Sequence, residues 1–195
     1  MADISITSAR PSRVAAKPAN PQPAAATAGA AGEPYWDIIE LLFFAYRDFV
    51  SDPDEVLVRL RFGRAHHRVL HFVNRNPGMK VADLLDVLKI TKQSLGRVLK
   101  QLIDQGYVVQ KEGANDRRQR LLYVSPAGEA LAMQLAALQT ARIARVLEAL
   151  GPDAPDAREG ARRFLAGMID PQERDRVLRM IARGNDPRRS ARDPS

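Results

Sequence analysis

Five polar side chains between residues 92 and 101 have the types and the spacing needed to contact duplex DNA. They are Lys92, Gln93, Arg97, Lys100 and Gln101. On a helix they lie opposite an apolar stripe made of Leu95, Val98, Leu99, Leu102 and Ile103. Lysine and arginine neutralise phosphates, and arginine and glutamine form paired hydrogen bonds with base edges in the major groove. The segment is therefore predicted to be a DNA recognition helix.

The start of this helix is suited to phosphate binding. Thr91 is predicted to be its N-cap, and Lys92 and Ser94 follow where free backbone N–H groups attract anions. Arg97, one turn further on, is predicted to contact a base edge or the adjoining phosphate, with Lys100 beyond it.

A shorter amphipathic helix over residues 81–88 comes immediately before. Its apolar positions are Val81, Leu84, Leu85 and Leu88. Only Lys89, Ile90 and Thr91 separate the two helices. A connection of three residues between two helices that bury facing stripes predicts a helix-turn-helix.

A basic β-hairpin is predicted to follow the second helix. Residues 107–111 and 120–124 have the composition of strands, and residues 112–116 are rich in turn formers. Arg117, Arg118 and Arg120 lie at its tip and rim, where they suit a narrow minor groove. Asp116 is spaced to hold the guanidinium of Arg118; the alternative is that Asp116 only shapes the turn.

The charge is concentrated on the same segment. Residues 59–125 hold 14 of the 30 basic side chains and 5 of the 23 acidic ones, a net charge of +9, whereas the remainder has a net charge of −2. A localised positive charge is what phosphate neutralisation requires.

Residues 63–128 resemble the MarR family of transcription regulators. The matching positions are Arg68-Val69-Leu70, Pro77-Gly78, Lys92-Gln93-Ser94, Arg97, Leu102, Gly106-Tyr107-Val108, Asp116-Arg117-Arg118 and Val124-Ser125-Pro126-Ala127-Gly128. Ser125 stands where threonine is commoner in the family. The resemblance implies a homodimer whose terminal helices interlock, and which leaves its DNA operator when a small ligand binds.

The expected fold is mainly α with a small β-hairpin, hence α+β. The predicted divisions are a disordered Ala/Pro-rich arm (1–33), an N-terminal dimerisation helix and linker (34–60), a winged helix-turn-helix module (61–125), C-terminal dimerisation helices (126–183) and a disordered tail (184–195). The arm could touch DNA phosphates; a transit peptide is the weaker alternative, because the segment lacks an amphipathic pattern.

The flanking helices are predicted to form the dimer interface. Residues 34–49 carry large apolar side chains on almost every side, so this helix needs burial from more than one direction. Ser125 and Pro126 open a long helix to about residue 150, and Gly151-Pro152 ends it. Two further helices are expected over 156–169 and 171–183; the first adds to the family pattern and is expected to enlarge the interface.

His67 and His71 lie four residues apart, hence on one helix face, where two imidazoles can ligate a metal. Metal or haem sensing is the minor alternative, and no metal or cofactor is expected. The resemblance implies instead a pocket for a small aromatic or anionic ligand between the dimerisation helices and the DNA-binding module. Its candidate residues are Trp36, Phe43, Tyr46, Phe62, His67, His71 and Phe72.

Several classes of function are excluded or disfavoured. The chain has no cysteine, which removes disulfides, thiolate metal sites and thiol-based sensing. No phosphate-binding glycine loop or nucleophile with a base is present, so no enzyme is expected. The longest apolar run, residues 41–46, is too short for a bilayer, and a cytoplasmic protein without membrane contact is expected. The prediction is a homodimeric repressor of transcription; the alternative is a winged helix that binds proteins.

Overall fold

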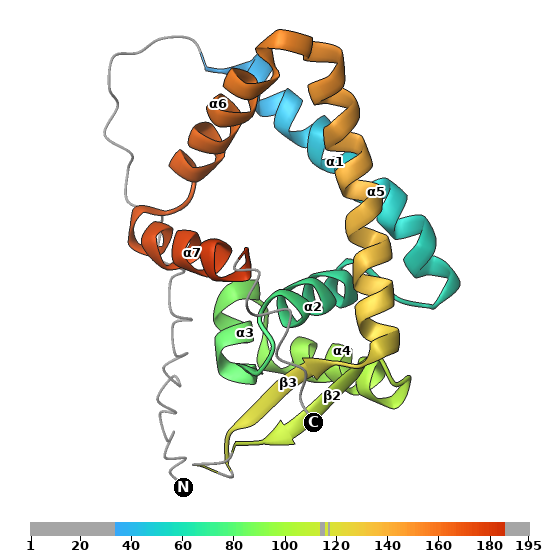
Figure 1. Ribbon diagram of the computed structural model, residues 1–195. Helices are drawn as coiled ribbons and strands as arrows, with labels where there is room; N and C mark the ends of the chain where they lie inside the picture. Colours follow the sequence, from blue (N-terminus) through green and yellow to red (C-terminus); the bar gives the residue numbers. More distant parts are fainter. Residues whose placement is uncertain (1–33, 114–115, 117, 186–195) are drawn as a thin grey trace, which may run out of the picture. The chain divides into compact units, whose positions relative to one another are not determined.

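The structure of the chain is a computed structural model that describes residues 34–113, 116 and 118–185. Its elements in chain order are α1 (Trp36–Arg59), α2 (Arg64–Arg75), β1 (Met79–Lys80), α3 (Val81–Leu88), α4 (Lys92–Asp104), β2 (Val108–Glu112), β3 (Arg120–Val124), α5 (Pro126–Leu150), the 3-10 turn η1 (Gly151–Asp153), α6 (Ala154–Gly167) and α7 (Pro171–Gly184) (Figure 1). None of the helices in these ranges has the length and apolar character that a membrane crossing requires. The predicted fold class, mainly helical with a small sheet, is confirmed.

The helix-turn-helix is formed by α3 and α4, as predicted. Lys89 ends α3 in the left-handed conformation, with φ of 51°, and its N–H donates to the Leu85 carbonyl at 2.9 Å. Thr91 is the N-cap of α4, since its side chain accepts the Ser94 N–H at 3.1 Å. The left-handed residue at the end of one helix and the cap at the start of the next together make the sharp turn.

The hairpin is part of a three-stranded antiparallel sheet with the order β1-β3-β2. Val108 pairs with Val124 and Glu112 with Arg120 across the hairpin, while Met79 of β1 pairs with Leu122. β1 was not expected from the sequence, because a two-residue strand is too short to show an alternating pattern.

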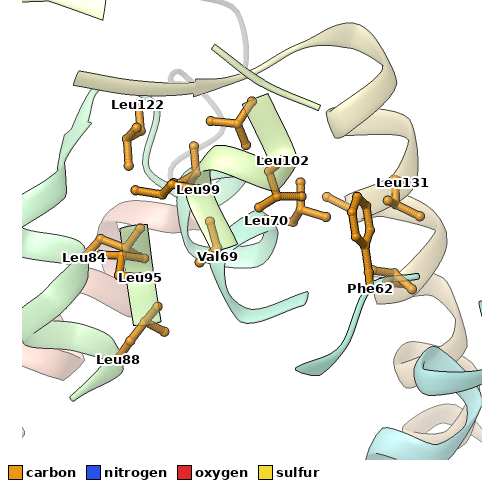
Figure 2. Close-up of a cluster of buried hydrophobic side chains, with 14 of the residues drawn as sticks. Phe62, Val69, Leu70, Leu84, Leu88, Leu95, Leu99, Leu102, Leu122 and Leu131 are labelled. Carbon is orange, nitrogen blue, oxygen red and sulfur yellow. The ribbon is translucent and has the colours of Figure 1, made fainter. Parts of the chain in front are cut away.

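Leucines from both helices of the helix-turn-helix fill the centre of the core (Figure 2). The buried residues around them are Phe62, Val69, Leu70, Val73, Leu84, Leu88, Leu95, Leu99, Leu102, Leu122, Leu131 and Leu135. Val69, Leu70 and Val73 of α2 are fully buried in this core. Each fully buried side chain of this size contributes about 1.5–3 kcal/mol, so the polar face of α4 is fixed outward by the packing behind it.

The junction between the hairpin and α5 depends on Ser125 and Gly128. The Ser125 hydroxyl accepts the Gly128 N–H at 3.0 Å and donates to the Gly106 carbonyl at 2.6 Å, which confirms the predicted cap. A Cβ at Gly128 would lie 1.9 Å from the Tyr107 carbonyl oxygen. Only glycine therefore allows α5 to begin this close to β2.

The first helix is longer than predicted. α1 continues past residue 49 to Arg59 and contains Pro53, so the linker expected before residue 60 is helical. Proline lacks an N–H and normally interrupts a helix. Here the Pro53 ring is fully buried, and its packing offsets the lost hydrogen bond.

The C-terminal helices follow the predicted order, with shifted ends. α6 and α7 are separated by Met168, Ile169 and Asp170, and the Asp170 carboxylate accepts the Gln172 N–H at 2.8 Å as the N-cap of α7. The tail does not begin at residue 184, because Gly184 closes α7 and Asn185 accepts a hydrogen bond from the Arg75 guanidinium. The predicted arm and residues 186–195 lie outside the described residues.

Candidate nucleic-acid interface

The recognition helix presents its polar residues to solvent as its pattern predicts. Thr91, Lys92, Gln93, Arg97 and Lys100 are exposed, whereas the opposite face, with Leu95, Leu99 and Leu102, is buried against the core. A helix of 13 residues with one face anchored and the other free can enter a major groove. The side-chain types along its free face can bond both phosphates and base edges.

The N-terminus of α4 is arranged for an anion. The Thr91 hydroxyl donates to Ser94 Oγ at 2.9 Å while it accepts the Ser94 N–H. This arrangement uses both functions of the Thr91 hydroxyl and leaves the Ser94 hydroxyl proton available. The N–H groups of the first helical turn and the helix dipole add positive potential at the same place, which suits a phosphate.

Two residues near the C-terminal half of α4 have partners within the protein. The Lys100 ammonium lies 2.6 Å from the Asp104 carboxylate, an exposed pair that a phosphate can replace. Gln101, which was predicted to face DNA, is half-buried and is held by partners within the protein. Its amide donates to the Arg61 carbonyl at 3.2 Å, and its oxygen lies 2.9 Å from His66 Nε2.

The strands of the wing carry their own charge pairs. The Arg120 guanidinium lies 3.0 Å from the Glu112 carboxylate directly across the hairpin. The Lys111 ammonium lies 5.3 Å from the centre of the Tyr123 ring, a cation–π contact. These contacts hold two basic side chains along the hairpin rather than leaving them mobile.

The tip of the wing is shaped by Asp116. Its carboxylate accepts the backbone N–H of Arg118 at 2.9 Å, and its carbonyl accepts the Gln119 N–H at 3.0 Å. The bond to Arg118 is therefore made by the backbone, whereas the sequence analysis expected the guanidinium. The Arg118 side chain is exposed, and Arg117 lies outside the described residues.

Three basic side chains of this surface remain available for DNA. Lys92, Arg97 and Arg118 form no ion pair with any residue in the described ranges. Other arginines of the basic segment have structural partners: Arg64 lies 2.8 Å from the Asp54 carboxylate, and Arg68 donates to the Leu88 carbonyl at 3.2 Å. Net charge alone therefore overstates the number of available phosphate contacts.

The residues predicted to form a ligand pocket lie in three different environments. Trp36, Phe43 and Tyr46 are exposed on α1. Phe62 is part of the core and stacks on His66 with ring centres 4.7 Å apart. Among the described cavities, one is lined by His71 and Phe72, together with residues of α3 and α7.

Two histidines of α2, His67 and His71, have pKa values lowered from the ordinary value of 6.5. Burial lowers the pKa of His67 against the opposing effect of the Asp54 carboxylate. The pKa of His71 is lowered by burial first, and then by the positive charges of His67 and Arg75. In the ranges that the structure describes, no group of three or more histidine, cysteine or acidic side chains is placed to hold a metal ion.

Sequence reasoning missed the contact between the turn and α7. The Lys89 ammonium lies 3.0 Å from the Glu173 carboxylate, although the two residues are far apart in the chain. Glu173 is held ionised by Lys89 and Arg176, whose hydrogen bonds lower its pKa. No local pattern could show this pair, because it arises from the return of α7 to the helix-turn-helix.

The sequence and the fold are both similar to those of known regulators. Residues 62–119 match the MarR family. The HTH-type transcriptional regulator PetP of Rhodobacter capsulatus is 46% identical over 136 residues, which cover 70% of this chain and 80% of that protein.

Solved structures show the same fold at low identity. FabT of Streptococcus pneumoniae in complex with DNA is 15% identical, with a TM-score of 0.59, and the match covers 70% of this chain and 97% of FabT. NadR in complex with 4-hydroxyphenylacetate is 22% identical, with a TM-score of 0.55, over 68% of this chain and 94% of NadR. At these identities the likeness supports the arrangement of the elements alone.

Proposed function

Because this chain belongs to the MarR family of DNA-binding transcription regulators, we propose that it acts as a homodimer on an inverted-repeat operator and releases it when a small ligand binds. In this proposal α4 enters the major groove and the wing enters the adjoining minor groove. Repression follows from occupation of the promoter.

The observation that carries the proposal is the outward face of α4. Lys92 and Arg97 are exposed and unpaired among the described residues, and they project from a helix whose other face is fixed by buried leucines. Rigid presentation reduces the entropy lost on binding. The FabT structure contains DNA bound to a protein of this fold, which supports the same use of the fold here.

The apolar surface of α1 supports the dimer. Large side chains on this helix remain exposed in the single chain, among them Leu41, Phe43, Phe44 and Tyr46. Monomeric proteins rarely expose so many apolar side chains together, and such surfaces usually mark interfaces. We assign a second copy of this chain as the partner, in keeping with the two-fold symmetry of an inverted repeat.

The ligand response is supported by the NadR structure, which holds 4-hydroxyphenylacetate. A ligand can release DNA only if it binds the DNA-free conformation more tightly than the DNA-bound one. A small organic molecule bound in a cavity beside the helix-turn-helix would favour the DNA-free conformation if it changed the distance between the recognition helices of the two subunits.

Selection of bound fragments from genomic DNA, followed by footprinting, tests the proposal. We expect an inverted repeat whose half-site centres lie about 10 base pairs apart, one turn of B-DNA. Salt-dependent retardation of this operator is expected, because phosphate contacts release counterions. A single unrepeated half-site would contradict the dimeric mode. Absence of retardation at low salt would favour a winged helix that binds proteins.

A further inference from the structure

A cavity of about 400 Å³ lies between α2, α3 and α7. Its apolar lining consists of Phe72, Val87, Val177, Met180 and Ile181. This volume falls in the range of sites for small organic molecules, and such sites are mainly apolar with a few polar groups. The cavity shares His71 and Phe72 with the aromatic pocket expected from the sequence, but it contains no residue of α1.

Charged side chains line one part of this cavity and bridge its walls. Glu173 of α7 bonds the Lys89 ammonium of the turn at 3.0 Å and the Arg176 guanidinium at 2.6 Å. Arg176 also lies 3.8 Å from the Asp86 carboxylate of α3. All four side chains are partly exposed, so they are accessible to an incoming polar group.

A second cavity of about 480 Å³ shares a wall with the first. Val87, Arg176 and Met180 line both cavities. The second cavity also contains Arg179 and Arg183, which form no ion pair or hydrogen bond within the described part of the chain, and its only acidic lining residue is Asp83. The adjoining spaces therefore differ in character: one is apolar and the other has an excess of positive charge.

We propose that these two cavities form one binding site for a small amphipathic organic anion. Its apolar body lies between Phe72, Val177 and Ile181, and its carboxylate lies at Arg179 and Arg183. The inference deepens the ligand response proposed above, on which it rests, by assigning a place and a chemical class to the ligand.

The position of the site explains how occupancy reaches the DNA-binding surface. Lys89 is the left-handed residue that ends α3 at the turn before the recognition helix. Its ion pair with Glu173 connects that turn to α7, which lies beside α3 (Figure 1). A ligand that moves α7 relative to α3 changes this connection, and with it the position of α4.

Calorimetric titration of the full chain with octanoate, without DNA, tests the site. We expect one octanoate per chain and weaker binding of octan-1-ol, which has a similar chain and no charge. The double variant Arg179→Gln, Arg183→Gln should lower octanoate affinity roughly tenfold or more, since charge-assisted hydrogen bonds are lost. It should leave octan-1-ol affinity unchanged. Arg158→Gln, an exposed arginine of α6, is the matched control and should have no effect.

A second variant tests the apolar cavity independently. Val177→Trp fills the space beside Phe72 and should abolish binding of both probes, while Met168→Trp, at an exposed methionine beyond α6, should not. Thermal melts identify any variant that fails to fold. Absence of octanoate binding to wild type, or equal affinity in the arginine double variant, would overturn the assignment.

Operator retardation measured on the same samples separates the two proposals. If the protein binds octanoate but does not retard DNA, the binding site is supported and the proposed function is wrong. Retardation without octanoate binding would retain the proposed function and overturn this site.

Discussion

Arg97 is the residue whose loss should affect DNA binding most directly. It is exposed, it has no ion pair among the described residues, and it lies one turn inside the recognition helix. We expect Arg97→Ala to cost about 1–3 kcal/mol of operator binding, with thermal stability nearly unchanged, because the side chain contributes little to the core. Fluorescence anisotropy with operator DNA measures the change. If the folded variant binds the operator with wild-type affinity, Arg97 does not contact DNA. Arg158→Ala provides the control.

Substitutions at Gly96 and Gly128 should change stability in opposite directions, because a side chain has free space at Gly96 and none at Gly128. A Cβ at Gly96 meets no atom within 4 Å, whereas one at Gly128 would overlap the Tyr107 carbonyl. Gly96→Ala should stabilise the protein by about 0.5–1 kcal/mol, since alanine favours the helix. Gly128→Ala should destabilise it by about 1–3 kcal/mol or more, because it overpacks a rigid junction. Urea denaturation measures both effects.

Gly96 also has a consequence for DNA. No packing in the described part of the protein requires glycine there, and a glycine would permit close approach of the DNA backbone. We expect Gly96→Ala to lower operator affinity while it raises stability. Unchanged affinity would show that Gly96 serves neither packing nor DNA.

His67 and His71 of α2 predict a pH dependence of stability. Burial lowers the folded-state pKa of His67 and His71 below the ordinary value of 6.5. The unfolded chain therefore binds more protons as the pH falls through 6.5, and folding loses stability in that range. His71→Phe should reduce the loss of folding stability between pH 7.5 and 5.5. Urea denaturation of the variant and of wild type at both pH values measures the difference. An identical pH dependence in the variant would contradict this role.

At the scale of elements, the wing is positioned by its turn and its strand pairing. Asp116 holds the backbone at Arg118, and Arg120 pairs with Glu112 across the strands. The backbone N–H of Arg118 is therefore held by the Asp116 carboxylate, and the Arg118 side chain is exposed to solvent. A narrow minor groove with strong negative potential would attract this side chain without distinguishing bases directly.

This arrangement gives different expectations for the two wing residues. Arg118→Ala should weaken operator binding and relax the preference for A·T pairs that flank each half-site, because a minor-groove contact is lost. Asp116→Ala should have a smaller effect in the same direction, since it loosens the turn but retains the charge. Site selection with each folded variant measures the preference. A uniform, salt-sensitive loss of affinity with unchanged flanking preference would leave only a phosphate contact.

At the scale of the whole molecule, the proposed dimer depends on the exposed apolar side chains of α1. Phe43 is 70% exposed in the single chain, an unfavourable position for a phenyl ring unless a partner covers it. Because each of two symmetric copies would lose about 1.5–3 kcal/mol of burial, Phe43→Glu should weaken dimerisation more than tenfold. Light scattering across a concentration series measures the change. Val109→Glu, an exposed apolar position on β2, is the control, and a monomeric wild type at micromolar concentration would refute the proposal.

Local patterns in the sequence were sufficient to predict the helix-turn-helix, the hairpin and the helix caps. The period of the leucines fixed both helices of the helix-turn-helix, and the polar types opposite them predicted the DNA-binding face. The caps at Thr91, Ser125 and Asp170 were also predictable, because each bonds an N–H only two or three residues away. The family followed from the order of these local motifs.

Features that depend on contacts between distant residues could be seen only in the folded chain. Pro53 continues α1 because burial compensates for its missing N–H, and Gln101 is held by hydrogen bonds because His66 and Arg61 lie beside it. The pair of Lys89 with Glu173, and the cavities beside it, exist because α7 returns to α3. Helical period and caps describe what a residue does within one element. They carry no information about which separate element will lie against it, and that choice is made by the packing of the whole chain.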